Sequence, residues 1–323
     1  MKVLVTGGAG FIGSHLVDGL LARGHEVIAL DNLSSGVRAN LEDAKKNPRF
    51  RLVKADLKKS PGVSRHLKDV ALVYHFAANP EVRLGESDPK VHFEENLVST
   101  FRLLEGMRMS RNAKRVVFAS TSTVYGEPTI MPTPEEYGPL IPISTYGASK
   151  LACEALISSY AYTFGIRGLI LRYGNVVGGG SQHGIIVDLI RKLRSERGSL
   201  EILGDGTQKK SYLHVTDCVA ATLLAVENFM KSDLRVDVYN VSSHDQIEVR
   251  RIAEIVANEM GRGNVPLRFT GGVDGGRGWM GDVKVMQLSI EKISKLGWKP
   301  MHNSTEAISL AAKQLAHRAG KDK

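Results

Sequence analysis

Seven glycine-rich residues near the start of the chain constrain its fold more than any other stretch. Gly7-Gly8-Ala9-Gly10-Phe11-Ile12-Gly13 follows an apolar, β-rich run over residues 2–6 and precedes a helical pattern over residues 14–23. Glycines at this spacing permit a tight turn and let amides at the helix N-terminus face a phosphate. Asp31 ends the next predicted strand, 18 positions after Gly13. Together these features predict a dinucleotide-binding βαβ unit.

The acid at position 31 also indicates which dinucleotide binds. A carboxylate there accepts hydrogen bonds from the adenosine ribose hydroxyls and repels a 2′-phosphate, and no arginine follows before Arg38. We therefore expect NAD rather than NADP. A Walker A loop is excluded, because Gly13 is followed by Ser14 and His15 and not by Lys and Ser or Thr.

Strand and helix patterns alternate through the first half of the chain. We expect strands over residues 25–30, 50–54, 72–76, 115–119 and 167–171, and helices over residues 90–109 and 146–164. Repeated βα units with apolar strands predict an α/β fold with a doubly wound parallel (Rossmann) sheet, which binds ligands at the carboxyl ends of its strands.

The alternation fades after residue 175, although residues 238–241 could return to the main sheet. We expect residues 1–175, with a return segment at about 207–243, to form an NAD-binding domain. Residues 176–206 and 244–323 are then expected to form a smaller C-terminal α+β lobe that binds substrate.

Tyr146 and Lys150 form a second candidate element. If they are helical, their four-residue spacing places both side chains on one face. A lysine charge beside a phenol favours the phenolate and lowers the phenol pKa, as a tyrosine base requires. The same pair also occurs on solvated helix faces, so its meaning depends on the dinucleotide motif around it.

Composition and charge narrow the remaining classes. No apolar run of the 323 residues approaches the roughly 20 that a membrane span needs, and a strand that begins at Lys2 leaves no room for a signal peptide, so we expect a cytoplasmic protein. The spacing of the two cysteines and ten histidines does not suggest a metal site. The net charge of +9 suits an anionic ligand, but the basic residues 45–59 lack the interleaved aromatics of a nucleic-acid site.

In their order along the chain, the motifs resemble those of the extended short-chain dehydrogenase/reductases, and within them the nucleotide-sugar 4-epimerases of the UDP-glucose 4-epimerase type. The resemblance covers nearly the whole chain. It rests on residues 6–13, Asp31-Asn32, Asp56-Leu57, His75-Phe76-Ala77-Ala78, Val124-Tyr125-Gly126, residues 146–150, Arg172-Tyr173-Gly174-Asn175, Gly204-Asp205-Gly206 and Leu296-Gly297-Trp298.

The resemblance implies a catalytic triad of Thr121, Tyr146 and Lys150. Tyr146 would take the proton of the sugar O4, Thr121 would hydrogen-bond that oxygen, and Lys150 would hold the nicotinamide ribose and lower the Tyr146 pKa. NAD would accept the C4 hydride and return it to the opposite face of the 4-keto sugar. The expected reaction is the interconversion of UDP-galactose and UDP-glucose, in a homodimer formed through residues 90–109 and 146–164.

The resemblance also implies two sets of binding residues. The NAD set is Gly7, Gly10, Phe11, Ile12, Gly13, Asp31, Asn32, Asp56, Leu57, Phe76, Ala77, Ala78, Asn96, Tyr146, Lys150 and Tyr173. The UDP-sugar set is Thr121, Ser122, Tyr146, Asn175, Lys210, Arg277, Asp282 and Met286.

Some of these positions depart from the family pattern. Lys210 stands where many members have an arginine that grips the diphosphate, and Lys lacks its planar fork. Trp279 occupies another usual arginine position, so diphosphate binding is assigned to Arg277. Met286 lies where the family limits the size of the C2 substituent, and its flexible side chain leaves N-acetylated sugars open.

The turn at Thr121-Ser122-Thr123 bears on the reaction type. The related 4,6-dehydratases carry Asp-Glu directly after the Thr, and decarboxylases usually keep a Glu in this turn, whereas this chain has neither. The remaining alternatives are a UDP-glucuronate or UDP-N-acetylhexosamine 4-epimerase, a reductase, or a non-catalytic relative that senses NAD or binds RNA.

Overall fold

The computed structural model describes residues 1–59, 63–195 and 198–321. These residues form two compact units. The first comprises Met1–Val124, Thr145–Arg172 and Val219–Tyr239, and the second comprises Tyr125–Ser144, Tyr173–Cys218 and Asn240–Lys323. The predicted division into an NAD domain and a substrate lobe concerns ligands as well as folding and stays a prediction.

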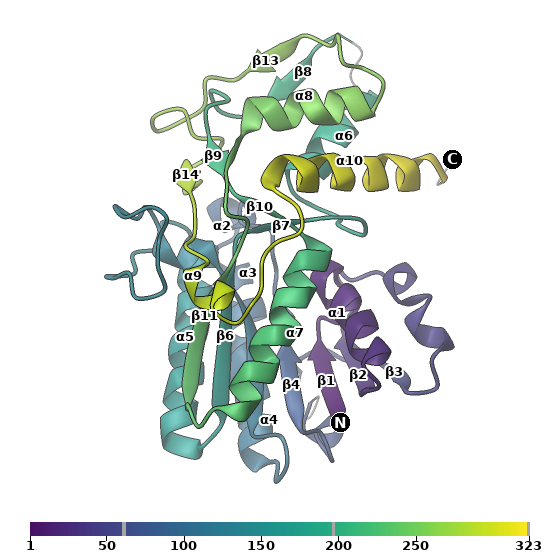
Figure 1. The fold of residues 1–323 in the computed structure, drawn as a ribbon, viewed down its shortest axis with the longest axis vertical. Helices are drawn as coiled ribbons and strands as arrows, with labels where there is room; N and C mark the ends of the chain where they lie inside the picture. Colours follow the sequence, from purple (N-terminus) through teal and green to yellow (C-terminus); the bar gives the residue numbers. More distant parts are fainter. Residues whose placement is uncertain (60–62, 196–197, 322–323) are drawn as a thin grey trace. The chain divides into compact units, whose positions relative to one another are not determined.

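A seven-stranded parallel sheet is the frame of the fold (Figure 1), with the order β11-β6-β5-β4-β1-β2-β3. The order reverses at β1, whose neighbours are β4 and β2, and a doubly wound sheet binds ligands beside such a switch point. This confirms the predicted Rossmann sheet, including the return of β11. The strands are β1 Lys2–Thr6, β2 Glu26–Asp31, β3 Phe50–Lys54, β4 Leu72–His75, β5 Arg115–Thr121, β6 Arg167–Tyr173 and β11 Val236–Val241.

Helices pack on both faces of this sheet. Those of the first unit are α1 Phe11–Ala22, α4 Ser99–Met109, α5 Thr145–Phe164 and most of α7 Val215–Lys231. On one face, Leu103 of α4 and Ile157 of α5 share a buried apolar core with Phe118 of β5. Helices α1 and α7 lie against each other, since a Cβ on Gly19 would stand 3.1 Å from Val219. The apolar strands are thereby covered from both sides, as a parallel sheet requires.

The long helix predicted over residues 90–109 is interrupted. It divides into α3 Lys90–His92, the π-helix η4 Phe93–Val98 and α4. The Asn96 carbonyl accepts hydrogen bonds from the Thr100 hydroxyl at 2.7 Å and from the Cys153 thiol at 3.5 Å. Side-chain donors thus form hydrogen bonds with a backbone carbonyl in the irregular turn. Such π-helical turns often mark functional sites.

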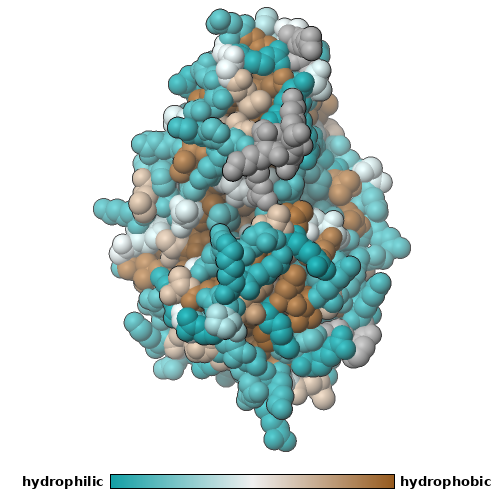
Figure 2. All heavy atoms as spheres, turned by 90° about the vertical axis from the view of Figure 1, so that its right-hand side faces the viewer, coloured by the Kyte–Doolittle hydropathy of each residue, from teal (hydrophilic) through white to brown (hydrophobic). Residues whose placement is uncertain are grey.

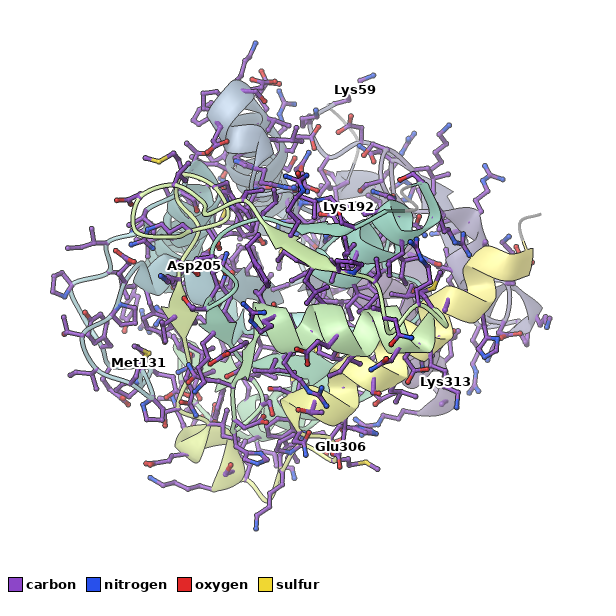
Figure 3. All side chains as sticks on the ribbon, turned by 90° about the horizontal axis from the view of Figure 1, so that it is seen from above. Lys59, Met131, Lys192, Asp205, Glu306 and Lys313 are labelled. Carbon is purple, nitrogen blue, oxygen red and sulfur yellow. The ribbon has the colours of Figure 1, made fainter. Side chains whose placement is uncertain are left out.

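The second unit is a smaller α+β assembly. Helices α6 Ile185–Ser195, α8 Val249–Glu259 and α10 Ser304–Lys321 share one apolar core; in Figure 3, Lys192 marks α6, and Glu306 and Lys313 mark α10. Strands of two or three residues, paired in small separate sheets, border this core. They are β7 Asn175–Val177 with β10 Tyr212–His214, β8 Leu200–Ile202 with β13 Leu267–Phe269, and β9 Lys209–Lys210 between β12 Ile247–Glu248 and β14 Val285–Met286.

Short helices connect the longer elements. Among the described residues they are η1 Arg38–Leu41, η2 Ala44–Lys46, η3 Ser64–His66, α2 Leu84–Ser87, η5 Ser122–Tyr125 and α9 Glu291–Ser294. The face drawn in Figure 2 is mostly hydrophilic, with apolar side chains in scattered patches. Within the described part of the chain, no helix combines the length and apolarity that crossing a membrane would take.

Candidate active site

The loop between β1 and α1 has the geometry of a phosphate-binding turn. Gly7 adopts φ +67°, which favours glycine, and a Cβ on Gly13 would clash with the Gly7 carbonyl oxygen. Helix α1 begins after Gly10 without a side-chain cap and without an acidic residue in its first turn. The amides of its first residues, Phe11 and Ile12, therefore face the end of the helix, where an anionic group is stabilised.

Asp31 ends β2 beside this loop. Its carboxylate is buried and accepts hydrogen bonds from the amides of Ala9 at 2.9 Å and Leu33 at 2.8 Å. A Cβ on Gly36 would stand 2.9 Å from the carboxylate oxygens, so the backbone passes closely here. Asn32 caps its own turn through Oδ1. The open helix end and the fixed carboxylate fit the pyrophosphate and the adenosine ribose of a dinucleotide.

The other predicted cofactor residues follow neighbouring strands. Asp56-Leu57 comes after β3, and Phe76-Ala77-Ala78 comes after β4. The Asp56 carboxylate accepts from a backbone amide of its own turn at 2.9 Å, and the Ala77 amide donates to the Thr6 hydroxyl at 3.3 Å. These segments lie in the first unit, whereas Tyr173, at the end of β6, belongs to the second.

Asn96 lies in the π-helix, and its side chain forms hydrogen bonds with other residues of the protein. Its Oδ1 accepts from the Asn79 amide at 2.8 Å, and its Nδ2 donates to the Ser149 hydroxyl at 2.9 Å. Ser149 in turn donates to the Tyr146 carbonyl at 2.8 Å. The side chain of Asn96 thus fixes the start of α5, and its contact with NAD stays a prediction.

The structure brings Thr121, Tyr146 and Lys150 together in the first unit. Thr121 ends β5, and the other two lie in the first turns of α5, where the Tyr146 phenol hydrogen-bonds Thr121. The Lys150 ammonium is buried and donates to the Ala119 carbonyl at 2.7 Å, 4.6 Å from the centre of the Phe118 ring. All three functional groups are therefore held at the carboxyl end of β5, where ligands of such a sheet bind.

Burial has the largest effect on the charges in this group. Burial raises the pKa of the Tyr146 phenol, and the hydrogen bond with Thr121 lowers it in part. Burial lowers the pKa of the Lys150 ammonium to about 8. The net pKa of the phenol is therefore raised, because burying a phenolate costs more than its contacts return. Lys150 donates to a backbone carbonyl, and its predicted effect on the Tyr146 pKa stays a prediction.

Three buried polar residues near this group have no role in the sequence-based prediction. His75 bridges the hydroxyls of Thr6 at 2.7 Å and Thr100 at 2.9 Å, and burial lowers its pKa to about 3, so the imidazole is neutral. Glu154 and Arg172 form a buried ion pair. The sequence contains two signals for them: a histidine that ends an apolar strand, and an acid four residues after Lys150.

Three predicted substrate residues lie together in the second unit. Asn175 is aligned with Tyr212 between β7 and β10, and Met286 is aligned with Lys210 between β14 and β9. The Asn175 side-chain amide donates to the Ser211 carbonyl at 3.0 Å, and Met286 is buried. Because Ser211 joins β9 to β10, all of these strands meet at one point. Ser122, by contrast, lies in the first unit.

The predicted diphosphate-binding cations are already paired with acids. Lys210 Nζ lies 2.5 Å from the carboxylate of Asp282, which also belongs to the predicted UDP-sugar set. Arg277 pairs with Glu127 at 2.6 Å and with Asp274 at 3.0 Å, and it donates to the Asp282 carbonyl at 2.8 Å. The structure therefore brings Lys210, Arg277 and Asp282 together as one network within the second unit.

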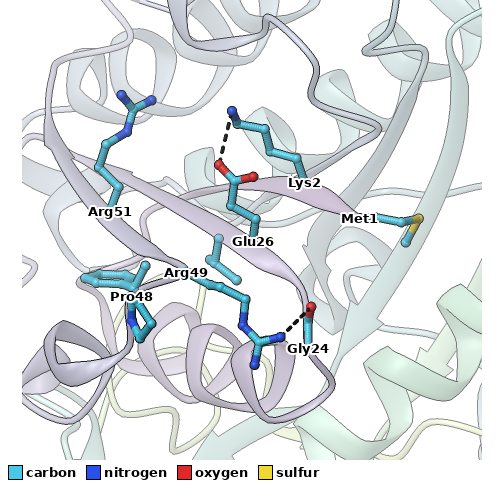
Figure 4. Close-up of a pocket in the computed structure, with 9 residues that line it drawn as sticks. Met1, Lys2, Gly24, Glu26, Pro48, Arg49 and Arg51 are labelled. Carbon is cyan, nitrogen blue, oxygen red and sulfur yellow. Dashed lines mark hydrogen bonds and ion pairs between the residues drawn. The ribbon is translucent and has the colours of Figure 1, made fainter.

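A hollow opens at the amino-terminal ends of β1, β2 and β3 (Figure 4). Lys2 and Glu26 form an ion pair of 3.1 Å across it, and Arg49 donates to the Gly24 carbonyl at 3.3 Å. Its other lining residues are Met1, Val27, Pro48, Phe50 and Arg51. The candidate site lies at the opposite, carboxyl ends of the strands, so we assign this hollow no part in it.

Comparisons with known proteins agree with this geometry. The model of the NAD dependent epimerase/dehydratase family matches residues 3–242. A UDP-glucose 4-epimerase of Corynebacterium glutamicum is 32% identical, over 95% of this chain and 93% of that protein. The crystal structure of a UDP-galactose 4-epimerase is 46% identical with a TM-score of 0.87, over 98% of this chain and 99% of that one.

A further solved structure is that of UDP-glucuronic acid 4-epimerase from Bacillus cereus, in complex with UDP-glucuronic acid and NAD. It is 28% identical to this chain with a TM-score of 0.86, over 99% of this chain and 100% of that one. The names of these proteins include both a glucose or galactose epimerase and a glucuronic acid epimerase, so the shared fold alone does not select the sugar.

We predict that Gly13→Ala weakens both the fold and NAD binding. The added methyl would clash with the Gly7 carbonyl, and such overpacking costs about 1–3 kcal/mol. Urea unfolding and an NAD titration measure the two effects. Gly198→Ala is the control, because no atom of the described residues lies within 4 Å of a Cβ there. Wild-type NAD affinity in Gly13→Ala would contradict the proposed role of this turn.

The buried Lys150 ammonium predicts a pH dependence of stability. Its pKa is about 8 when folded against an ordinary value of 10.5, so between these values the unfolded chain binds more protons. The stability contributed by this group is therefore lowest below pH 8 and rises up to about pH 10.5, by at most about 3 kcal/mol.

Urea unfolding from pH 7 to 10.5 tests this dependence. The comparison is between Cys153→Ala and Cys153→Ala/Lys150→Met, a background that removes the neighbouring thiol. We expect the free energy of unfolding of the protein that keeps Lys150 to rise with pH relative to that of the Lys150→Met protein across this range. Parallel curves would show that Lys150 keeps its ordinary pKa in the folded protein.

Proposed function

The chain belongs to the NAD dependent epimerase/dehydratase family, and we propose that it interconverts UDP-galactose and UDP-glucose as an NAD-dependent 4-epimerase. The observation that carries this proposal is the placement of Thr121, Tyr146 and Lys150 together at the carboxyl end of β5. The likeness to a UDP-galactose 4-epimerase at 46% identity supports the choice of sugar.

When bound, NAD supplies a hydride acceptor that stores the sugar hydride and gives it back. Gly7, Gly10 and Gly13 would admit its pyrophosphate to the N-terminus of α1, and Asp31 would accept from its adenosine ribose. Because the hydride is returned, the reaction would consume no reductant.

The protein's own groups would manage the proton of the sugar O4. Tyr146, as the phenolate, would take that proton as the 4-keto sugar forms, and the resulting phenol would return it as the alcohol reforms. Thr121 hydrogen-bonds the phenol and would offer its hydroxyl to O4. Since burial raises the pKa of the phenol, the phenol must first lose its own proton before it can accept the one from O4, and that ionisation is the step that needs help from neighbouring positive charge.

In this proposal, the turn after β5 favours epimerisation over the elimination of water from the 4-keto sugar. Elimination of water would need an acid beside the sugar C6, and the residues after Thr121 are Ser122 and Thr123. In the second unit, Met286 is buried beside Lys210 and would limit the room at the sugar C2.

A panel of UDP-sugars assayed without added reductant tests the proposal. Purified protein supplied with NAD is incubated with UDP-galactose, UDP-glucose, UDP-N-acetylglucosamine and UDP-glucuronate, and the products are resolved by chromatography. We expect kcat/KM for the galactose and glucose pair to exceed the others at least tenfold. A preference for the uronate or N-acetyl pair would replace the proposed substrate, and loss of water or carbon dioxide would replace the reaction.

We predict that Tyr146→Phe abolishes turnover while leaving NAD bound. The variant removes the only atom that exchanges the proton and keeps the ring that packs against His92 at 5.6 Å. Activity and bound NAD are measured on the same preparation. Tyr162→Phe, on the same helix but 65% exposed, is the control. Substantial activity in Tyr146→Phe would refute the assignment of the base.

We further propose a homodimer that forms through η4, α4 and α5. Apolar side chains are exposed along these helices, with Phe101 at 46% and Met109 at 72%. The others are Phe93, Tyr162 and Phe164. Apolar groups concentrated on neighbouring helices are typical of a protein interface, and a second copy would cover the same face in both partners.

We predict that Phe101→Glu shifts the protein from dimer to monomer, because a carboxylate buried at an isologous interface faces its own copy. Sedimentation equilibrium measures the change. Ile130→Glu is a matched control, since Ile130 is exposed to 55% but lies outside these helices. Sedimentation of the unaltered protein as a monomer would exclude the dimer.

A further inference from the structure

A buried acid–base pair lies beside the Thr121–Tyr146–Lys150 group. Glu154 of α5 and Arg172 of β6 are each 5% exposed. Arg172 Nη2 donates to Glu154 Oε2 at 2.7 Å, and Arg172 Nε donates to Glu154 Oε1 at 3.1 Å. Burying two ions carries a large desolvation cost, which the attraction between them roughly offsets, so such a pair adds little stability by itself. Its location suggests another role.

Glu154 also binds the strand that carries Thr121. The Ser120 hydroxyl donates to Glu154 Oε1, and the preceding carbonyl, that of Ala119, accepts from Lys150 Nζ at 2.7 Å. Two consecutive residues of β5 are therefore held by two residues of α5 that lie one helical turn apart. Thr121 follows directly, so both contacts fix the position of its hydroxyl.

We propose that Glu154 is a positioning residue for the reaction, which clamps α5 to the end of β5 and serves as the buried counter-charge of the Lys150 ammonium. The inference rests on the proposed function, because Lys150 and Thr121 are assigned to the site there. Glu154 itself would touch neither the sugar nor NAD.

The groups around Lys150 support this assignment. Tyr146 and Cys153 share its helix, His75 faces it from β4, and Arg172 of β6 is bound to Glu154. His75 is neutral, because burial and the charge of Lys150 lower its pKa to about 3. Burial lowers the pKa of Lys150 to about 8, and Cys153 and Glu154 raise it in part. Since burial also raises the pKa of the Cys153 thiol, the lasting negative charge is that of Glu154.

The variant that tests the proposal is Glu154→Gln in a Cys153→Ala background. The amide keeps an oxygen for Ser120 and Arg172 but removes the charge. We expect kcat for UDP-galactose to fall about tenfold and KM to change less than twofold. The alkaline limb of the pH–kcat profile should move to lower pH by about one unit, because Lys150 would lose its proton more readily.

The control is Glu227→Gln, which breaks a surface ion pair with Arg23 of 2.9 Å in the same unit. Its kcat, KM and pH profile should equal those of the background protein. Glu154→Asp should restore the alkaline limb, since it returns the carboxylate. If Glu154→Gln does not fold, Glu154→Gln/Arg172→Met removes both buried charges, and the same measurements apply to it.

A second measurement does not depend on activity. The Lys150 amine is titrated by NMR in protein labelled with 15N-lysine, its signal identified by its loss in Lys150→Met. We expect its titration midpoint to fall in Glu154→Gln and to stay unchanged in Glu227→Gln. Inactivity of the unaltered protein towards UDP-sugars, together with this shift, would overturn the proposed function alone. If the protein is active but Glu154→Gln changes neither the Lys150 titration midpoint nor the pH–kcat profile, the proposed role of Glu154 is overturned.

Discussion

The hydrogen bond from the Lys150 ammonium to the Ala119 carbonyl is the contact on which the candidate site depends. It joins the first turns of α5 to the last residues of β5, and so decides where the Tyr146 phenol stands relative to Thr121. The π-helix adds a second attachment, because the Asn96 side chain donates a hydrogen bond to Ser149 near the start of α5. Both contacts hold the start of α5 in place. A small movement of this helix would shift Tyr146 and Lys150 at the same time, and both would lose the geometry that the reaction needs.

Desolvation sets the electrostatics of this group. It favours the neutral forms of both Tyr146 and Lys150, although the two side chains would carry opposite charges when ionised. A site of this kind holds its proton on the phenol at rest and gives it up only when charge is rearranged nearby. That behaviour suits a reaction in which a proton and a hydride leave the same carbinol and later return to it.

The sequence predicts the parts of the structure that follow from strong periodicity or from glycine. β1 and β3 have the predicted bounds, and the turn at Gly7–Gly13 lies where the motif predicts. Helix α1 begins at Phe11, three residues earlier than predicted, because the motif itself forms its first turn. The π-helix could not be predicted, since the apolar spacing on either side of it is that of an ordinary helix. β9 and β14 have two residues each, too few to show a period. The pairing of Lys210 with Asp282 joins positions far apart in the sequence, which no local pattern records.

The Lys210–Asp282 pair changes what the binding of an anion in the second unit would mean. A diphosphate that reached Lys210 would compete with a carboxylate already 2.5 Å from the same nitrogen, so its affinity would be the difference between two ion pairs rather than the gain of one. Binding becomes an exchange of anions. Because the released Lys210 can re-form its ion pair with Asp282, the diphosphate would leave faster than it would leave an unpaired cation. Fast release matters in an enzyme whose substrate and product differ only at one carbon, since either of them must be able to enter and leave the same site.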